Sequence, residues 1–311
     1  MMEKIAVYGS GKIGACEATL TTGNGFTTVV IGHSEAGLER CRKTMETNWD
    51  DLIKEGLATE QNKKAAMDLV TITNDPSALE GTTFVFEAVA EADDIKGSVY
   101  KDINQYAADN VIIASCTSSI GADILADLTD KPEQLLVAHP FQPAHMLPLV
   151  EVVLHDKTSK ETLKRTQDIL DKLSREVVVL NKSVPGFIVN RLAQALFRES
   201  IYMIEEGVTS AADIDKAVKF AVGMRYASIG LLEYYDDVGY DLETAIAKNV
   251  YPDLCDTKET QDLIKAGFAS GKTGREAGEG LYDWSEKDVD DFRYRKQAPY
   301  FKGVKQWTMP E

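Results

Sequence analysis

Residues 9–14, which read GSGKIG, constrain the fold of this chain more than any other stretch. The apolar run at residues 4–8 predicts a strand before them, residues 15–22 continue them as a helix, and residues 27–31 predict a second strand. Glycines at these three positions allow a tight turn, close approach of a pyrophosphate, and close packing of helix on strand. The free N–H groups of the helix N-terminus then face the phosphates. The motif therefore predicts a dinucleotide-binding βαβ unit.

The end of the second predicted strand lacks the acidic residue that usually holds the ribose hydroxyls of NAD. The chain has Gly32, His33 and Ser34 at this place. Gly32 removes the carboxylate that would repel a 2′-phosphate, and His33 and Ser34 are able to donate hydrogen bonds to one. Arg40 and Arg42 lie on the next predicted helix, where a solvated helix face is the simpler role. The sequence therefore favours NADP modestly over NAD.

Strand and helix patterns alternate through the first part of the chain. Further strands are predicted at residues 70–73, 83–87, 111–115, 135–138, 149–154 and 176–180, and helices at 35–55, 59–68, 94–106, 120–128 and 159–173. This alternation, with apolar strands, predicts an α/β fold with a doubly wound, mostly parallel sheet of the Rossmann type. Such sheets bind ligands at the carboxyl ends of their strands, where Ser118, His139 and the glycine-rich turn all fall.

After residue 183 the pattern becomes helical. Residues 186–206 predict a long amphipathic helix that starts at Pro185 and stops at Gly207, and residues 210–220 predict another with Ser210 as its N-cap. We expect a dinucleotide-binding domain at residues 1–183 and an all-helical substrate and dimerisation domain at residues 184–311. The apolar stripes of the second domain indicate a partner surface, most simply that of a homodimer.

Residues 135–153 (LLVAHPFQPAHMLPLVEVV) read as two buried strands joined by a Pro-rich loop. An ionised Glu151 inside an apolar strand is costly unless it is paired, and His139 at the end of the neighbouring strand is the obvious partner. A carboxylate that orients an imidazole and favours its protonated form makes an acid–base device. From this stretch alone, a loop histidine and a solvent-facing glutamate are the alternative.

Composition argues against several classes of function. The chain has 50 acidic and 34 basic residues, a net charge of −16, which disfavours nucleic-acid and anionic-membrane partners. No segment approaches the roughly 20 apolar residues of a membrane span, and the N-terminus lacks a signal-peptide pattern. The cysteines show no metal-ligand spacing, so we expect no metal site and reduced thiols in a cytoplasmic protein; they are Cys16, Cys41, Cys116 and Cys255.

With these residues in place, the chain resembles the L-3-hydroxyacyl-CoA dehydrogenase family from residue 4 to about residue 284. The similar segments are GSGKIG (9–14), EAVAE (87–91), TSS (117–119), HP (139–140) with PLVEV (148–152), PGFIVNRL (185–192), LEYYDDVGYD (232–241) and GEGLYDW (278–284). The resemblance implies an NAD(P)-dependent oxidoreductase that moves hydride reversibly between its cofactor and the 3-hydroxy or 3-oxo group of a short substrate. A CoA thioester of fatty-acid metabolism is the usual substrate of the family.

The resemblance also implies roles for single residues. His139 matches the general base, Glu151 the carboxylate that orients it, and Ser118 and Asn190 the residues that hold the substrate oxygen. The expected cofactor-binding residues, some from the motifs and some from the resemblance, are Gly9, Gly11, Lys12, Ile13, Gly14, Gly32, His33, Ser34, Ala88, Glu91, Lys96, Cys116 and Ser118. Because all four reaction-centre residues are present, an active enzyme is expected rather than a non-catalytic dinucleotide-binding protein.

Departures from the family pattern leave the substrate open. CoA-using members tend to have a lysine pair before Gly56, where this chain has Asp50, Asp51 and Glu55, which would repel nucleotide phosphates. HPFQP, PLVEVV and GMRYASIG (223–230) look like the free-acid branches of lambda-crystallin, the L-gulonate 3-dehydrogenase, and L-carnitine dehydrogenase, whereas DDVGYD looks like the hydroxybutyryl-CoA enzymes.

The roles of three further residues, in substrate binding or in cofactor contact, stay open from the sequence. Gln142 stands where fatty-acid members usually have Asn, and it can donate a hydrogen bond to the substrate with longer reach. Arg225 either binds a free substrate carboxylate bidentately or forms a surface ion pair. Cys116 either touches the nicotinamide or is a buried inert thiol, the simpler reading.

Overall fold

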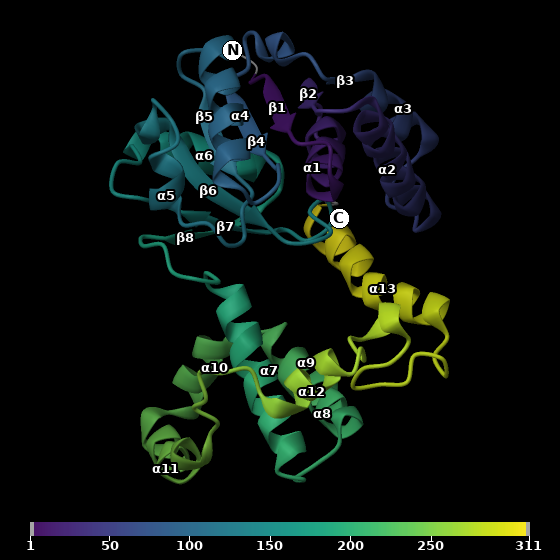
Figure 1. Cartoon of the computed structure of the whole chain (residues 1–311), viewed down its shortest axis with the longest axis vertical. Coiled ribbons are helices and arrows are strands. Elements are labelled where there is room, and N and C mark those ends of the chain that lie inside the picture. Colours follow the sequence, from purple (N-terminus) through teal and green to yellow (C-terminus); the bar gives the residue numbers. More distant parts are fainter. Residues whose placement is uncertain (1–2, 309–311) are drawn as a thin grey trace. The chain divides into compact units, whose positions relative to one another are not determined.

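The computed structural model describes residues 3–308, with side chains described through residue 304. The chain divides into two compact units (Figure 1). The first unit ends at Ile188 and takes up the chain again from Tyr294, and the second unit is Val189–Arg293. The expected domain boundary, after residue 183, lies a few residues before the observed boundary, which follows Ile188. The returning segment contributes Phe301, which is buried, so a purely C-terminal second domain does not describe the observed units.

An eight-stranded sheet forms the centre of the first unit (Figure 1). Its strands are β1 (Ile5–Tyr8), β2 (Thr28–Ile31), β3 (Val70–Thr73), β4 (Phe84–Glu87), β5 (Ile112–Ser115), β6 (Leu135–Pro140), β7 (Leu149–Val153) and β8 (Glu176–Leu180). They lie in the order β3-β2-β1-β4-β5-β6-β7-β8, and every neighbouring pair is parallel except β6 and β7. This confirms the predicted doubly wound, mostly parallel sheet, whose strand order switches direction between β1 and β4.

Helices cover both faces of this sheet. They are α1 (Lys12–Gly23), α2 (Glu35–Lys54), α3 (Glu60–Asp68), α4 (Asp93–Tyr106), α5 (Ala122–Ala126) and α6 (Lys160–Lys172). Successive strand residues point to opposite faces, so Ile5 and Val7 belong to one apolar core and Ala6 to the other. The first core includes residues of α1, α2 and α6, and the second includes residues of α4 and α5. Because both faces are buried, the strands are nearly continuous apolar runs.

The second unit is helical, as predicted. It contains α7 (Val189–Glu205), α8 (Ala211–Ala217), α9 (Gly223–Tyr226), α10 (Leu231–Val238), α11 (Tyr240–Val250) and α12 (Asp262–Ala269), and α13 (Val289–Thr308) begins within it. Ser210 caps α8, and Gly207, with a φ of 68°, follows the end of α7, both as expected. The predicted start of α7 at Pro185 is wrong. Gly186 and Phe187 have φ values of 77° and 48°, so this turn delays the helix until Val189.

Across residues 3–308, none of the helices combines the length and the apolar character that a membrane span requires.

Candidate active site

The turn between β1 and α1 leaves room for a phosphate group on one side. Gly9 has a φ of 129°, and a Cβ added to it would lie 2.3 Å from the carbonyl oxygen of Ala88. A Cβ on Gly14 would lie 1.8 Å from the carbonyl oxygen of Gly9, so helix and turn pack closely. In contrast, a Cβ on Gly11 would meet nothing within 4 Å, and no side chain caps α1. An open turn below an uncapped helix N-terminus suits a pyrophosphate.

Gly32, which follows β2, lies in a crowded position. A Cβ added to it would lie 2.5 Å from Ser10 Oγ and 2.6 Å from Leu38 Cδ2. A carboxylate side chain at this position would therefore displace Ser10 from the glycine-rich turn. The absence of an acid after β2 is thus part of how the two loops pack, and it removes a negative charge from the ribose end of the predicted cofactor site.

Two hydroxyl groups and a guanidinium gather at the N-terminus of α2. Ser34 is its N-cap and accepts a hydrogen bond from the Gly37 N–H at 3.3 Å. A Cβ added to Gly37 would lie 3.0 Å from Ser10 Oγ, 3.1 Å from Ser34 Oγ and 3.7 Å from an Arg40 Nη atom. His33 is exposed immediately before this cap. Arg40, which the sequence placed on a solvated face, therefore extends back toward the end of β2.

His139 and Glu151 are brought together by the antiparallel pairing of β6 and β7. The register places the two residues directly opposite each other, and His139 Nδ1 lies 2.9 Å from Glu151 Oε2. Their exposed fractions are 6% and 0%. The second carboxylate oxygen, Oε1, accepts the Ile188 N–H at 2.8 Å. The two side chains thus form the hydrogen-bonded pair that the apolar strand pattern implied.

Two aromatic rings pack against the imidazole of His139 and restrict its orientation. Phe141 packs edge-on against it with 4.7 Å between ring centroids, and Phe187 lies 5.5 Å away. With Nδ1 bonded to Glu151, Nε2 is the nitrogen left to exchange a proton with a substrate. The left-handed turn that delays α7 is also what places Phe187 on this ring and the Ile188 N–H on the carboxylate.

A second buried carboxylate lies at the carboxyl end of β4. Glu87 is 0% exposed, and its oxygens accept hydrogen bonds from Lys96 Nζ at 2.8 and 2.9 Å, Ser115 Oγ at 2.6 Å, Tyr100 OH at 3.0 Å and the Val89 N–H at 3.0 Å. We did not single out Glu87 from the sequence. Its sequence signal is an acid in an otherwise apolar strand, which is the feature that also indicates Glu151, although Glu87 ends its strand and Glu151 lies in the middle of one.

Glu91 fixes the turn that follows β5. Its carboxylate accepts hydrogen bonds from Thr117 Oγ1 at 2.8 and 2.9 Å and from the Ser118 N–H at 3.1 Å. Lys96 Nζ lies 3.5 Å from the same carboxylate. Lys96 is only 1% exposed, so its ammonium group contacts the exposed part of the site only indirectly, through its ion pair with Glu91. Ser118 itself is exposed in the turn after β5, which is separated from β1 and the glycine-rich turn by β4 in the strand order.

The other predicted residues have varied settings. Gln142 is exposed in the loop between β6 and β7, and Cys116 is half-buried, with burial raising the pKa of its thiol well above the usual value. Asn190 and Arg225 belong to the second unit, on α7 and α9. The exposed guanidinium of Arg225 stacks on Tyr234, with its central carbon 4.3 Å from the ring centroid.

Arg175, Glu17 and His145 form a buried cluster of titratable groups next to the loop between β6 and β7, which the sequence did not indicate. Arg175 donates hydrogen bonds to the carbonyl oxygens of Ala144 at 3.1 Å and Leu147 at 3.0 Å. Glu17 on α1 is 2% exposed, and burial raises the pKa of its carboxyl to about 7, partly offset by the charge of Arg175. Burial and the same guanidinium lower the pKa of His145 to about 4. Arg175 therefore orders the loop that carries Gln142.

Comparison with protein families decides the identity of this arrangement. The model of the 3-hydroxyacyl-CoA dehydrogenase NAD-binding domain matches residues 4–184, and the model of the C-terminal domain of the same enzymes matches residues 186–284. The chain belongs to the 3-hydroxyacyl-CoA dehydrogenase family. It is accordingly an NAD-binding oxidoreductase of the 3-hydroxyacyl-CoA or hydroxy-acid dehydrogenase type, as the resemblance predicted.

Relatives of this dehydrogenase differ in their substrates. L-carnitine dehydrogenase of Oceanobacillus iheyensis is 33% identical over 229 residues, 74% of each chain. 3-Hydroxybutyryl-CoA dehydrogenase of Clostridioides difficile is 27% identical over 284 residues, 91% of this chain and all of the relative. The crystal structure of 5-formyl-3-hydroxy-2-methylpyridine 4-carboxylic acid 5-dehydrogenase, described as an NAD+ dependent dismutase, superimposes with a TM-score of 0.88 and 27% identity over both complete chains. The family thus allows both CoA and free-acid substrates.

Proposed function

We propose that this chain oxidises the hydroxyl group of a small 3-hydroxy acid reversibly, with His139 as the general base. The observation that carries the proposal is the buried hydrogen bond between His139 Nδ1 and Glu151. Nε2 takes the hydroxyl proton, and Glu151 stabilises the imidazolium that forms. Ser118 and Asn190 are proposed to hold the substrate oxygen. When bound, the nicotinamide supplies the hydride acceptor.

For the cofactor, we propose that NADP is preferred to NAD. The open turn at Gly11 fits the pyrophosphate that both dinucleotides share. Three features support binding of the 2′-phosphate of NADP. Gly32 carries no carboxylate that would repel it. The hydroxyls of Ser10 and Ser34 lie at the N-terminus of α2, and the Arg40 side chain extends toward them. A guanidinium and hydroxyl donors suit a phosphate, whereas the ribose hydroxyls of NAD usually meet an acid.

For the substrate, we propose a free carboxylic acid rather than a CoA thioester. Asp50 on α2 pairs with Lys63 on α3, so one of the few lysines near Gly56 is already neutralised, and Asp51 and Glu55 add negative charge. No carboxylate of the described residues lies within the 4 Å of a salt bridge to Arg225, which leaves its guanidinium available for a substrate carboxylate. The similarity to the carnitine and pyridine-carboxylate dehydrogenases also supports this choice.

Absorbance of the reduced nicotinamide tests the substrate assignment. Purified protein is mixed with NADPH or NADH and either acetoacetyl-CoA or a free short 3-oxo acid. We expect turnover of the free acid, and an Arg225→Ala variant should raise its KM about tenfold or more, since a charged hydrogen bond contributes about 1.5–3 kcal/mol. Rapid oxidation with acetoacetyl-CoA alone would instead make the chain a hydroxybutyryl-CoA dehydrogenase, the function that the Clostridioides difficile relative favours.

The second unit supports a further proposal, a homodimer. Among its described residues, Ile201 is the one apolar side chain that is buried, although the unit spans Val189–Arg293. Large apolar side chains are exposed on several helices, including Phe220 at 69%, Leu232 at 81% and Phe268 at 79%. A helical unit with so little core does not offset the entropy of folding by itself. A second copy that covers these helices supplies the missing core.

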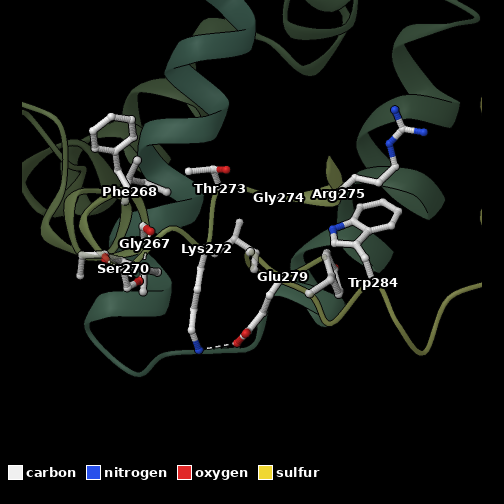
Figure 2. Close-up of a pocket in the computed structure, with 15 residues that line it drawn as sticks. Gly267, Phe268, Ser270, Lys272, Thr273, Gly274, Arg275, Glu279 and Trp284 are labelled. Atoms are coloured by element: carbon white, nitrogen blue, oxygen red, sulfur yellow. Dashed lines mark hydrogen bonds and ion pairs between the residues drawn. The ribbon is translucent and has the colours of Figure 1, made fainter. Parts of the chain in front are cut away.

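A pocket on the second unit indicates one place for such contacts. It has a volume of about 730 Å³, and α12 and residues 272–284 line it. Figure 2 shows its lining, with Lys272 paired to Glu279 on one side. Phe268 borders this pocket and is among the most exposed apolar side chains of the chain.

A further inference from the structure

We propose that Glu87 is a positioning residue of the active site, which acts through Lys96 and Glu91 on the turn that carries Ser118. The inference rests on the proposed role of Ser118 and goes beyond it. Glu87 contacts neither the predicted substrate site nor the glycine-rich turn through its side chain, because its described partners lie directly after β4, on α4 and on β5.

Glu87 is built into the fold as an anion. Lys96, Tyr100, Ser115 and the Val89 N–H all donate to its two oxygens, and the Lys96 ammonium and the Val89 N–H are groups that can only donate. Its exposed fraction is 0%, and that of Lys96 is 1%. A buried ion pair often contributes little net stability, since desolvation offsets the attraction. A buried ion pair whose carboxylate is fully hydrogen-bonded therefore points to a role besides stability.

The position of Lys96 supplies that role. Its ammonium group bonds both oxygens of Glu87 and also lies 3.5 Å from Glu91, which is 40% exposed at the surface. Glu91 in turn accepts the Thr117 hydroxyl and the Ser118 N–H. These five residues thus form one continuous path from the buried end of β4 to the exposed turn after β5.

Backbone pairing ties the two ends of this path together. Glu87 lies opposite Ser115 in the parallel register of β4 and β5, and the Cys116 N–H donates to the Glu87 carbonyl oxygen at 2.7 Å. The turn that begins at Cys116 therefore has a fixed start, and Glu91 fixes its continuation at Thr117 and Ser118. If Glu87 loses its charge, Lys96 retains Glu91 as its counter-charge. The ammonium then draws Glu91 away from the turn, and the Ser118 backbone loses its anchor.

Four proteins test the inference: the wild type, Glu87→Gln, Ser118→Ala and the double variant. Glutamine keeps the size of the side chain and one acceptor oxygen for Tyr100 and Ser115, while it removes the charge and replaces the other oxygen by an NH2 donor. We expect Glu87→Gln to lower kcat about tenfold, as is typical of residues coupled through one network; kcat is measured at saturating cofactor, because Lys96, Glu91 and Ser118 are also expected to line the cofactor site. In the Ser118→Ala background, the same substitution should change kcat less than about twofold.

This double-mutant cycle distinguishes a failure of the inference about Glu87 from a failure of the proposed role of Ser118. Equal losses in both backgrounds would show a general structural effect and overturn the inference. If Ser118→Ala alone keeps wild-type activity, the proposed role of Ser118 fails, whatever Glu87 does. Tyr100→Phe is the matched control, because it removes one hydrogen bond to Glu87 and leaves the Lys96 link intact, so its kcat should stay within about twofold.

Folding is checked for each variant by circular dichroism at the assay temperature. If Glu87→Gln does not fold, Glu87→Asp takes its place, since it keeps the charge but shortens the reach to Lys96 by one methylene group. It should show the same dependence on the Ser118 background. Independence from that background would again overturn the inference.

Discussion

His139 Nδ1 and Glu151 Oε2 lie 2.9 Å apart, across the one antiparallel step of an otherwise parallel sheet. Because β7 runs against β6, an acid in the middle of β7 faces a histidine near the end of β6, at the sheet edge where ligands bind. The turn at residues 186–188 closes the far side of the carboxylate with a backbone N–H. The antiparallel step and the turn before α7 therefore both lie at the proposed site of proton transfer.

Replacing Arg40 by Ala tests the proposed cofactor preference. The side chain lies near Ser10 and Ser34, where a 2′-phosphate is proposed to bind. We expect the Kd for NADPH to rise about tenfold or more, since a charged hydrogen bond contributes about 1.5–3 kcal/mol, and the Kd for NADH to stay the same. Arg42→Ala, on the same helix, is the control and should change neither value. Equal effects on both cofactors would exclude a 2′-phosphate contact. Fluorescence titration of the wild type and the two variants with each cofactor measures the six dissociation constants.

The buried carboxyl of Glu17 should make the folding free energy depend on pH. Its pKa rises from 4.5 to about 7 on burial, so the folded chain binds the extra proton between these values. Stability from this group is therefore complete at acidic pH and falls as pH rises toward 7. The full cost is roughly 3 kcal/mol above that pH, at about 1.36 kcal/mol for each unit of pKa.

Glu17→Gln, which mimics the protonated acid, should remove this cost. Urea unfolding at pH 5 and pH 8 measures the difference between variant and wild type, so that other titrating groups cancel. We expect the variant to be the more stable protein at pH 8, with a much smaller difference at pH 5. The same difference at both pH values would show that Glu17 does not titrate in this range.

The proposed dimer predicts a mass twice the chain's 34.2 kDa in solution. Light scattering after gel filtration measures it directly. Leu232→Glu places a charge on the most exposed of the apolar side chains named above and should shift the protein toward a monomer of lower thermal stability. Lys101→Glu, on the exposed side of α4 in the first unit, should leave the dimer intact. A wild-type protein that is monomeric at micromolar concentration would contradict the proposal.

The sequence predicted all eight strands, because both faces of the sheet are buried and each strand is a short apolar run between turn residues. The start of α7 could not be read in the same way. A positive φ at Phe187 is costly for a bulky residue, and only the surrounding structure imposes it. The amphipathic pattern of residues 186–206 therefore extended the helix too far.

Pairs within the site show the same limit. His139 and Glu151 were predictable together because neighbouring strands fix which residues face each other. The direction of the Arg40 side chain and the partners of Glu87 were not predictable, since both depend on segments far apart in the sequence that meet only in the folded chain. The return of the chain to the first unit at Tyr294 likewise has no local signal.

The central claim is that the His139–Glu151 pair performs the proton transfer. The most direct measurement is kcat for His139→Ala and Glu151→Gln with whichever 3-oxo substrate the wild type reduces, alongside cofactor affinity. His155→Ala is the control, because that ring contacts the Leu135 carbonyl oxygen at 3.1 Å, away from the pair. General-base catalysis predicts a loss of roughly 10²–10⁴-fold for His139→Ala, a smaller loss for Glu151→Gln, and unchanged cofactor binding. Turnover near that of the wild type in His139→Ala would contradict the account.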